Sequence, residues 1–287
     1  MANPELPISV LIATKNRDAL LLNRALPSVQ RQWLQPDLVV LVSDGRRLPQ
    51  ELLGKLRAVI APTSIVALEN GRSPGAASAW NTGLSHLDRL GTRGFVAILD
   101  DDDEWDAEHL QECMTAAGRK GANIVVSGLR RMVNGSCIPR PLPRELSVDD
   151  FLVGNPGWQG SNTFVELDLM LAVGGFTDGL LSLNDRDLAI RLLRHHASRL
   201  AYTGKWTATW HHDAAASLSA PRSRAKISGL RRFWSIHGRA MTPAQSAAFF
   251  DRACRYFGVL RDEIIADGPD LLSTTSTVGG SCAAGEK

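Results

Sequence analysis

The segment Phe95-Val-Ala-Ile-Leu-Asp-Asp-Asp-Asp-Glu-Trp105 joins an apolar run to a dense cluster of carboxylates. Its first five residues are rich in β-formers and follow Gly94, which predicts a buried strand. Four consecutive aspartates, 100–103, come directly after that strand. Adjacent carboxylates repel each other, and Mg²⁺ or Mn²⁺, usually bound by one or two carboxylates plus substrate phosphate oxygens, removes that repulsion. The alternative is a solvated acidic turn before a helix that starts near Asp106, where acidic residues are favoured.

The residues before this segment predict alternating strands and helices. Apolar runs predict strands at 7–14, 39–42 and 64–68, and helices are predicted at 18–32, 49–59 and 76–87. Such alternation implies right-handed crossovers and a mainly parallel α/β sheet. Ligands of open α/β sheets bind beyond the carboxyl ends of the strands, which is where the aspartates would lie. The chain has no Gly-x-Gly-x-x-Gly and no Walker-type Gly-Lys-Ser/Thr, which disfavours dinucleotide and P-loop sites.

The second half of the chain is less regular. Helices are predicted at 104–120, 167–173 and 185–196, the last with Asn184 as its cap, and strands at 123–127, 163–165 and 202–210, the last resembling an edge strand. Residues 130–143 predict a hairpin or an extended crossing, 221–257 mostly basic helix, and 267–287, rich in Ser, Thr and Gly, a disordered tail.

Size and composition restrict the classes of protein. A length of 287 residues suits one large domain or two intimate halves, and a net charge of +2 gives no indication of nucleic-acid binding. No run of 18 apolar residues predicts a transmembrane helix. The absence of a secretory leader, with four scattered cysteines that lack metal-ligand spacing, predicts reduced thiols in a cytoplasmic protein. Peripheral association with the inner face of a membrane stays open.

Six motifs occur along the chain in a characteristic order. They are Ile8-Ser-Val-Leu-Ile-Ala-Thr-Lys-Asn-Arg17, Val42-Ser-Asp-Gly45, Gly75-Ala-Ala-Ser-Ala-Trp-Asn-Thr-Gly83, Leu99-Asp-Asp-Asp-Asp103, Gly174-Gly-Phe-Thr-Asp178 and Asn184-Asp-Arg-Asp-Leu188. Over roughly residues 6–215 this series resembles the family 2 glycosyltransferases of the GT-A fold. The resemblance implies an open, mainly parallel sheet flanked by helices. The implied catalytic domain spans 1–220, with a nucleotide-sugar-binding half at 1–103 and an acceptor-side half at 104–220, followed by a basic helical extension at 221–266.

The resemblance also implies an activity. Family 2 enzymes of this type are inverting, divalent-metal-dependent transferases that use Mn²⁺ or Mg²⁺, so a hexosyltransferase with a UDP-sugar donor and a hydroxyl acceptor is expected. An envelope glycan precursor, a lipid-linked acceptor, a natural product and a peptide all stay open as acceptors.

Particular residues take their roles from the motifs they match. Asp100 to Asp102 match the family's Asp-x-Asp, with Asp100 and Asp101 implied at the donor and Asp102 as the metal ligand, and Asp185 matches the general base. The remaining residues of the implied donor site are Ala13, Lys15, Asp44, Arg72 and Asn81, with His212 placed near the metal or the diphosphate.

Four departures from the family's pattern affect the identity of the nucleobase most. Ala13-Thr14-Lys15-Asn16 replaces the frequent Pro-Thr-Tyr-Asn, and Ser43-Asp44 replaces paired aspartates. Trp80 stands where an arginine is frequent, and Asn184-Asp185 replaces Glu-Asp. The carboxylate at 185 is retained, so the implied base is unaffected.

Several roles have competing explanations. Trp158 either stacks on a sugar ring or packs in the core, and Asp187 suits a cap or a salt bridge better than catalysis. The basic residues of 221–239 either face an anionic lipid or polymer or point into solvent from a packed helix. A catalytically silent nucleotide-sugar-binding protein is the alternative function. A metal-dependent phosphohydrolase is disfavoured because Glu104-Trp105, rather than Thr or Ser, follow the aspartates.

Overall fold

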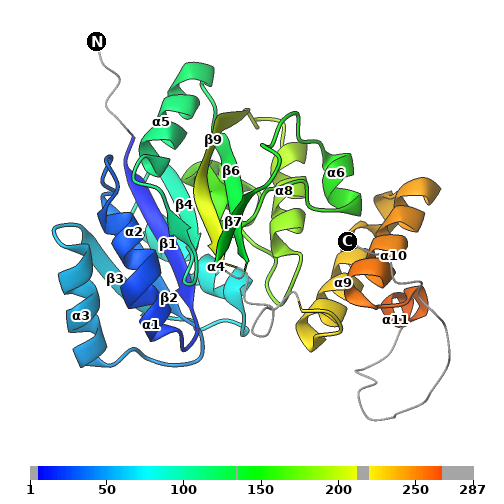
Figure 1. Cartoon of the computed structure of the whole chain (residues 1–287), viewed down its shortest axis with the longest axis horizontal. Coiled ribbons are helices and arrows are strands. Elements are labelled where there is room, and N and C mark those ends of the chain that lie inside the picture. The colour runs from blue at the N-terminus through cyan, green and yellow to red at the C-terminus, as the bar shows by residue number, and fades with distance from the viewer. Residues whose placement is uncertain (1–5, 134, 212–219, 267–287) are drawn as a thin grey trace.

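Four apolar strands form a parallel half-sheet in the computed structural model, which describes residues 6–133, 135–211 and 220–266. They are β1 (Ile8–Thr14), β2 (Leu38–Ser43), β3 (Ser64–Glu69) and β4 (Phe95–Asp100), which lie side by side in the order β3-β2-β1-β4. The crossovers carry α1 (Asp18–Leu20), η1 (Leu21–Ala25), α2 (Leu26–Gln30), α3 (Gln50–Ile60) and α4 (Ala76–Arg89). Figure 1 shows this half in blue and cyan.

The sheet continues beyond β4 with mixed strand directions. β8 (Thr163–Glu166) lies antiparallel between β4 and β6 (Ile124–Val133), and β9 (Leu200–His211) runs parallel to β6. The short β5 (Glu104–Trp105) pairs antiparallel with β9, and β7 (Ser136–Pro139) forms a hairpin with β6. The remaining helical segments are α5 (His109–Lys120), α6 (Val148–Val153), η2 (Gly160–Asn162), α7 (Leu167–Ala172), α8 (Asn184–Arg194), α9 (Arg224–His237), η3 (Gly238–Ala240), α10 (Pro243–Phe257) and α11 (Arg261–Ile265).

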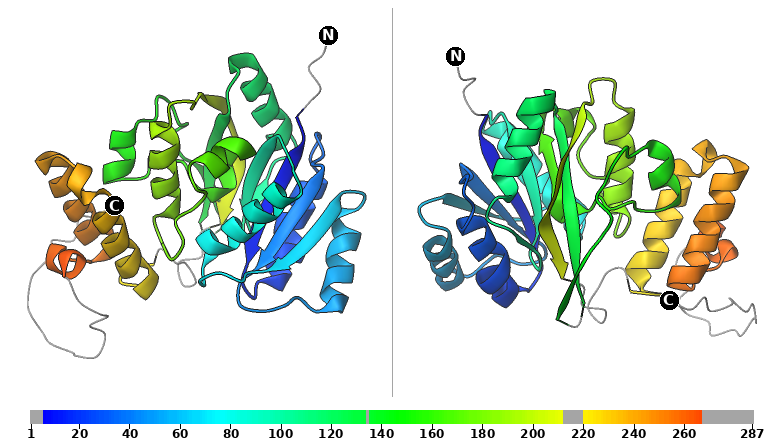
Figure 2. Two further views of the ribbon diagram at one scale, coloured as in Figure 1. Left: turned by 180° about the vertical axis from the view of Figure 1, so that it is seen from behind. Right: turned by 45° about the horizontal axis from the view of Figure 1, so that its top comes forward.

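Helices cover both faces of the sheet, as Figures 1 and 2 show. Successive residues of a strand face opposite sides, so Val10 and Ile12 of β1 pack in one layer and Leu11 and Ala13 in the other. One apolar layer includes residues of α2, α3 and α5, and the other residues of α4, α6, α8, α9 and α10. The prediction of an open, mainly parallel sheet flanked by helices is confirmed.

Glycine allows α4 to lie close against the sheet. A Cβ atom on Gly83 would lie 2.2 Å from Cδ1 of Leu11, a residue with no exposed surface. Helix α4 begins after Gly75, whose φ of 125° is available to glycine at little cost. The two glycines therefore fix the position of α4 relative to the carboxyl end of β1.

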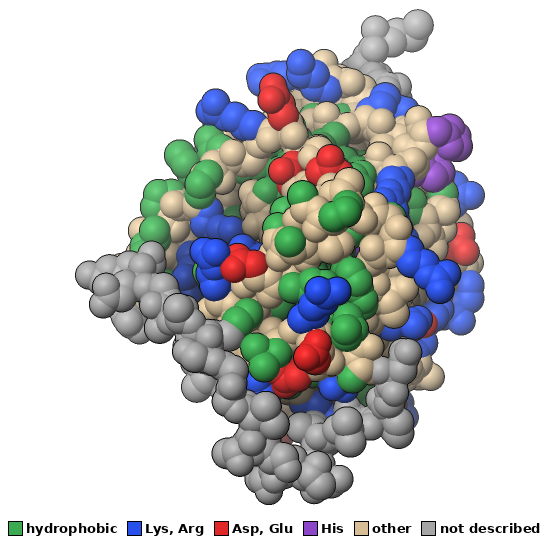
Figure 3. All heavy atoms as spheres, turned by 90° about the vertical axis from the view of Figure 1, so that its right-hand side faces the viewer, with side chains coloured by type: hydrophobic (Ala, Val, Ile, Leu, Met, Phe, Trp, Pro, Cys, Tyr) green, Lys and Arg blue, Asp and Glu red, His purple; other side chains and the backbone are tan. Residues whose placement is uncertain are grey.

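The C-terminal helices share the core of the sheet. Phe233 of α9 and Phe249 of α10 are buried in the same apolar layer as α4 and α8. The guanidinium carbon of Arg186, on α8, lies 4.5 Å from the ring centroid of Phe233. Figure 3 views the molecule from the side of these helices.

The basic residues predicted on this extension are partly used within it. Arg222 forms an ion pair with Glu263, and Nε of Arg231 donates to the backbone carbonyl of that same residue. Lys226 is only 4% exposed. These three residues support the packing explanation rather than an open basic face on α9.

Some expectations are wrong in detail. The helix predicted at 104–120 begins at His109, because Glu104 and Trp105 pair with β9 instead. The predicted edge strand, β9, lies between β6 and β5. Asn184 is the first residue of α8 rather than its cap, although its side-chain oxygen accepts from the N–H of Asp185.

Two further findings concern membranes and cysteines. No helix in the described ranges is long and apolar enough to cross a membrane. Cys113 and Cys137 are free, but Cys254 is disulfide-bonded, so the prediction of four reduced thiols is wrong there. The tail predicted at 267–287 lies outside the described residues.

Candidate active site

The carboxyl ends of β1, β2 and β4 meet at one edge of the sheet. Ala13 is in register with Asp100, and Thr14 is in register with Ser43. The hydroxyl of Thr14 donates to Oδ2 of Asp101 at 2.6 Å, which connects the end of β1 to the acidic segment. The parallel register thus brings residues from three motifs together at this edge.

Each of the four aspartates has a different environment. Asp101 is buried, and its Oδ1 lies 3.1 Å from Nη1 of Arg17. The half-buried Asp102 forms an ion pair with the same guanidinium. Asp103 is 1% exposed and accepts hydrogen bonds from the Ser161 hydroxyl and from the N–H of His211. Only Asp102 therefore combines some exposure with a single cationic partner.

Asp100 lies against the loop that precedes β8. Its N–H donates to Oγ of Ser161 at 3.1 Å. A Cβ atom on Gly160 would lie 3.3 Å from one carboxylate oxygen of Asp100 and 3.5 Å from the ring of Trp80. The missing side chain at position 160 leaves the carboxylate of Asp100 space beside the buried ring.

The acidic cluster carries more negative charge than its described surroundings compensate. Burial, together with the charges of neighbouring aspartates, holds the pKa of Asp100 well above its usual value. Burial and the charge of Asp102 raise the pKa of Asp103 to about 8. The pKa of Asp101 is also raised by burial, against the opposing effect of Thr14 and Arg17. A cation placed among these groups would be strongly stabilised.

Asp185 lies in the first turn of α8 and is partly exposed. Burial raises its pKa to about 7, and the charge of Lys226 opposes the rise. The charge of Asp185 is in turn one cause of the raised pKa of Asp100. The two carboxylates, which are far apart in the sequence, are thus within electrostatic reach of each other.

The residues present suit a hard divalent cation in part. Among residues 6–133, 135–211 and 220–266, no three His, Cys, Asp or Glu side chains are grouped as a complete metal site would require. Magnesium or manganese bound with a diphosphate needs only one or two protein carboxylates, and the aspartate oxygens are of the right kind. His212 lies outside the described residues, and the side chain of His211 contacts Glu104 instead.

The residues expected at the nucleobase gather around Asp44. Asp44 is 5% exposed and accepts hydrogen bonds from Asn70 and from the N–H of Gly75. Nζ of the exposed Lys15 lies 3.3 Å from Oδ2 of Asp44. Ala13 is buried near the end of β1, two residues before Lys15.

Arg72 and Asn81 meet at Asp178. Nη1 of Arg72 lies 3.0 Å from Oδ2 of Asp178, and the amide of Asn81 donates to Oδ1 of the same residue at 2.7 Å. The Asn81 amide also exchanges hydrogen bonds with the backbone of Phe176. Both residues join α4 and the loop before it to the turn at 174–178.

Two of the open alternatives are resolved by burial. Trp158 is 1% exposed, donates from its indole nitrogen to Thr163 and packs edge-on against Phe151, so it belongs to the core and does not stack on a sugar. Asp187 is fully buried, forms an ion pair with Arg191 and is hydrogen-bonded to His237, which confirms a salt-bridge role.

Sequence reasoning missed three residues of the site. The motif that contains Arg17 does not predict its pairing with Asp101 and Asp102, and Ser161, which donates to Asp103, lies in none of the six motifs. Lys226 was grouped with exposed basic residues although it is buried. Only Arg17 had a usable sequence signal, because it belongs to the first motif and directly follows Lys15 and Asn16.

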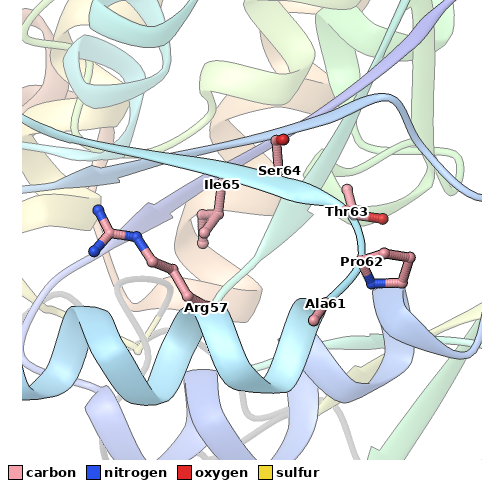
Figure 4. Close-up of a pocket in the computed structure, with 6 residues that line it drawn as sticks. All are labelled: Arg57, Ala61, Pro62, Thr63, Ser64 and Ile65. Carbon is pink, nitrogen blue, oxygen red and sulfur yellow. The ribbon is translucent and has the colours of Figure 1, made fainter.

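A separate hollow lies elsewhere on the molecule (Figure 4). It is lined by Arg57, Ala61, Pro62, Thr63, Ser64 and Ile65. These residues form the end of α3 and the start of β3. The hollow therefore lies at the amino end of the parallel strands, whereas the aspartates follow the carboxyl end of β4.

Comparisons with known proteins agree with this arrangement. The sequence model of glycosyl transferase family 2 matches residues 9–161. No curated protein matches the chain.

Similar solved structures include those of S. aureus TarS. The 1–349 form in complex with UDP-GlcNAc has a TM-score of 0.62 at 18% identity, with 87% of this chain and 73% of that one covered. The corresponding UDP complex has a TM-score of 0.58 at 17% identity, covering 87% and 72%. A longer TarS structure gives 0.59 at 18% identity, and there the chain spans only 44% of its relative's length. This likeness confirms the prediction of a GT-A type fold.

Proposed function

The chain belongs to glycosyl transferase family 2, and on this premise we propose an inverting, divalent-metal-dependent hexosyltransferase that moves a sugar from a UDP-sugar to a hydroxyl acceptor. The single observation that carries the proposal is the proximity of two carboxylates from distant motifs: the charge of Asp185 reaches Asp100 and raises its pKa. A base and an acidic cation site are thereby available to one substrate pair. The UDP and UDP-GlcNAc complexes of S. aureus TarS support a UDP-sugar as the donor.

The donor side is assigned to the ends of β1, β2 and β4. Ala13, Lys15 and Asp44 would surround the nucleobase, and Asp100 and Asp101 would face the sugar and the diphosphate. Asp102, together with His212, would hold Mn²⁺ or Mg²⁺ against the diphosphate. When bound, that cation stabilises the negative charge that develops on the leaving nucleoside diphosphate.

Arg17 is a further source of positive charge on the proposed donor side. It already pairs with Asp101 and Asp102, so it lies where a diphosphate would approach the aspartates. A guanidinium presents planar donors that suit phosphate oxygens. Arg17 would keep the acidic segment ordered and supply positive charge to the donor.

Asp185 is the proposed general base. A base is most effective when its pKa lies near the working pH, and burial places the pKa of Asp185 at about 7. Its carboxylate would accept the proton of the acceptor hydroxyl as that oxygen attacks the sugar. Loss of such a base lowers the rate of transfer by roughly 10²–10⁴-fold.

Calorimetry with UDP and Mn²⁺, combined with a transfer assay, tests these assignments. Asp102→Ala should lose metal-dependent UDP binding, whereas Asp185→Asn should bind UDP as the wild type does and lose transfer. Asp88→Ala, an exposed carboxylate at the far end of α4, is the matched control and should change neither property. Equal metal-dependent binding by wild type and Asp102→Ala would overturn the metal assignment.

Measurement of turnover distinguishes the proposed enzyme from a catalytically silent nucleotide-sugar-binding protein. The silent protein would bind UDP-sugars and release no UDP with any acceptor or with water. Slow hydrolysis of a UDP-sugar by the wild type, reduced in Asp185→Asn, would exclude that alternative.

A further inference from the structure

Basic side chains gather near the first turn of α8, where Lys226 lies close to Asp185 and Arg252 lies close to both Arg186 and Lys226. This basic cluster consists of Arg131, Arg140, Arg186, Lys226 and Arg252, which come from β6, the segment after β7, α8, α9 and α10. Within the described ranges, none of its members forms an ion pair with a carboxylate. Figure 3 shows several Lys and Arg side chains on the side of the molecule that carries the C-terminal helices.

Three guanidinium groups of the basic cluster converge on one short segment. Arg186 donates to two carbonyl oxygens in the last turns of α6, at 2.8 and 2.9 Å. Nη2 of Arg140 lies 3.4 Å from the carbonyl oxygen of Asn155. The guanidinium of Arg252 lies 3.7 Å from the position that a Cβ atom on Gly154 would take. Side chains from three elements thus contact residues 151–155, and the chain continues from there to Gly160, which lies beside Asp100.

The cluster is under electrostatic strain that no described carboxylate relieves by direct pairing. Burial lowers the pKa of Arg140, and the charges of Arg252 and Arg131 lower it further. Burial and Arg252 lower the pKa of Arg186 to about 9. The pKa of Lys226 is lowered to about 8 by burial and by Arg186, although Asp185 opposes the shift. Unpaired cations that repel one another are stabilised by an anion.

Lys226 is the member of the basic cluster that lies close to the proposed base, Asp185. It lies close enough to oppose the rise of that carboxyl's pKa, and Arg186 is the next residue after Asp185 on α8. Charge therefore changes from negative at the end of β4 to positive beyond α8. An anionic group on a substrate is repelled at the first position and attracted at the second.

We propose that the acceptor carries a phosphate group, which Arg140 and Arg252 bind while the acceptor's hydroxyl faces Asp185. This inference rests on the proposed function, because it names the acceptor of the same site. Arg140 and Arg252 are half-exposed and present planar donors that suit phosphate oxygens bidentately. Arg186 and Lys226 are buried and contribute positive potential without direct contact. Phosphate is favoured over carboxylate because it can carry a second negative charge to a site with several cations.

Calorimetry with sn-glycerol 3-phosphate, glycerol and glycerate tests this inference, with UDP and Mg²⁺ at saturation so that the diphosphate site is filled. Glycerol 3-phosphate should bind more tightly than either of the other two probes. Arg140→Gln and Arg252→Gln should each weaken its binding by about tenfold, the loss expected for a hydrogen bond to a charged group. Arg255→Gln is the matched control, because Arg255 lies three residues along the same helix, is exposed and pairs with Asp251.

Three outcomes would overturn the inference. They are equal binding of glycerol and glycerol 3-phosphate, equal losses in Arg252→Gln and Arg255→Gln, and tighter binding of glycerate than of glycerol 3-phosphate. Arg252→Lys, which keeps the charge, should retain most of the binding, and melting temperatures of all variants report on folding.

Failure of this inference is distinguishable from failure of the proposed function. If UDP binds and glycerol 3-phosphate does not, only the phosphate-bearing acceptor is lost. If UDP does not bind, the proposed function fails, and the titration repeated without UDP still decides whether Arg140 and Arg252 hold a phosphate.

Discussion

Asp185 and Lys226 illustrate how neighbouring residues set the reactivity of one carboxyl. Burial alone pushes a carboxylate toward its protonated form, and a nearby cation partly restores its charge. Asp185 experiences both effects, and its pKa of about 7 results from them. Lys226 holds its place through a hydrogen bond to Ser182 at 2.7 Å and a contact with the ring of Phe257. The ionisation of the proposed base therefore depends on a residue of the C-terminal helices.

This dependence predicts the pH profile of transfer. Because the pKa of Asp185 is raised to about 7, the base is protonated and inactive below that pH, so kcat/KM should fall as pH drops below about 7. Lys226→Met removes the opposing cation and should move the fall to higher pH, whereas Lys226→Arg should leave it nearly in place. Rates measured from pH 5.5 to 9 check both expectations. A wild-type profile that stays flat down to pH 5.5 would contradict the role of Asp185.

The positions of single residues were predictable from sequence only where a motif carries them. The aspartates and Asp44 follow the carboxyl ends of β4 and β2, as their motifs imply, and the charge of Asp185 reaches Asp100. The pairing of Arg17 with Asp102 and the burial of Trp158 depend on distances between segments that no local pattern encodes. Basic residues of one helix look alike in sequence, so Lys226 could not be told from its exposed neighbours.

Helices α8 and α9 are joined by a buried ion-pair network. Asp187 of α8 accepts from His237 of α9 at 2.9 Å and pairs with Arg191 one turn along its own helix. These hydrogen bonds and the charge of Arg191 outweigh the cost of burial and lower the pKa of Asp187 to about 2. The network fixes the helix that carries the proposed base against the C-terminal extension.

Loss of that network should destabilise the fold in a pH-dependent manner. A pKa lowered from 3.8 to about 2 corresponds to about 2 kcal/mol of stability, which is present above pH 4 and disappears as pH falls toward 2. Asp187→Asn should therefore lower the free energy of unfolding by about 2 kcal/mol at pH 7. Urea unfolding of both proteins between pH 7 and pH 3 measures this difference, which should narrow toward the acid end. A constant difference across that range would show that the charge is not responsible.

Glycines inside two helices provide a matched pair at the element scale. Gly83→Ala places a methyl group 2.2 Å from the buried Leu11 and should destabilise the protein by about 1–3 kcal/mol, as overpacked cores do. Gly54 of α3 has no atom within 4 Å of its Cβ position, so Gly54→Ala should stabilise by up to about 1 kcal/mol through helix propensity. Thermal unfolding of both variants checks the opposite signs. Equal effects would mean that α4 does not lie as close to β1 as described.

At this scale the strands and helices of residues 7–89 follow from their apolar periodicity, because each buried run is long and is bounded by polar loops. The short β5 does not follow. Its two residues adopt strand geometry through pairing with Ala208 and Thr209, which lie about a hundred positions along the chain. Tertiary pairing also extends β6 well beyond the predicted 123–127.

The whole molecule has a core that continues from the sheet into the C-terminal helices. Leu230, Phe233 and Phe249 belong to the same apolar layer as Leu188 and Leu192 of α8. The sequence predicted the extension as basic helix, but its composition could not reveal that its apolar side completes this layer.

A shared core predicts cooperative unfolding. Differential scanning calorimetry of the full chain should give one transition, because α9 and α10 cannot separate without exposing Phe233 and Phe249. Phe233→Ala should lower the melting temperature of that single transition, with a loss of about 3–5 kcal/mol. Two resolved transitions, of which Phe233→Ala shifts only one, would show instead that the extension unfolds independently.

Strand β8 is antiparallel to both of its neighbours, β4 and β6, so its amino end lies beside their carboxyl ends. The residues entering β8, Gly160 and Ser161, therefore contact Asp100 and Asp103, which leave or follow β4. One rim of the molecule is thus assembled from the exits of several strands and the entrance of another. Insertions in the entrance loop would change the surroundings of Asp100 and Asp103 while leaving the residues around Asp44, and the registers of the sheet, unaltered. In such a scaffold the residues at the entrance of β8 can change while those proposed to contact the nucleobase stay the same.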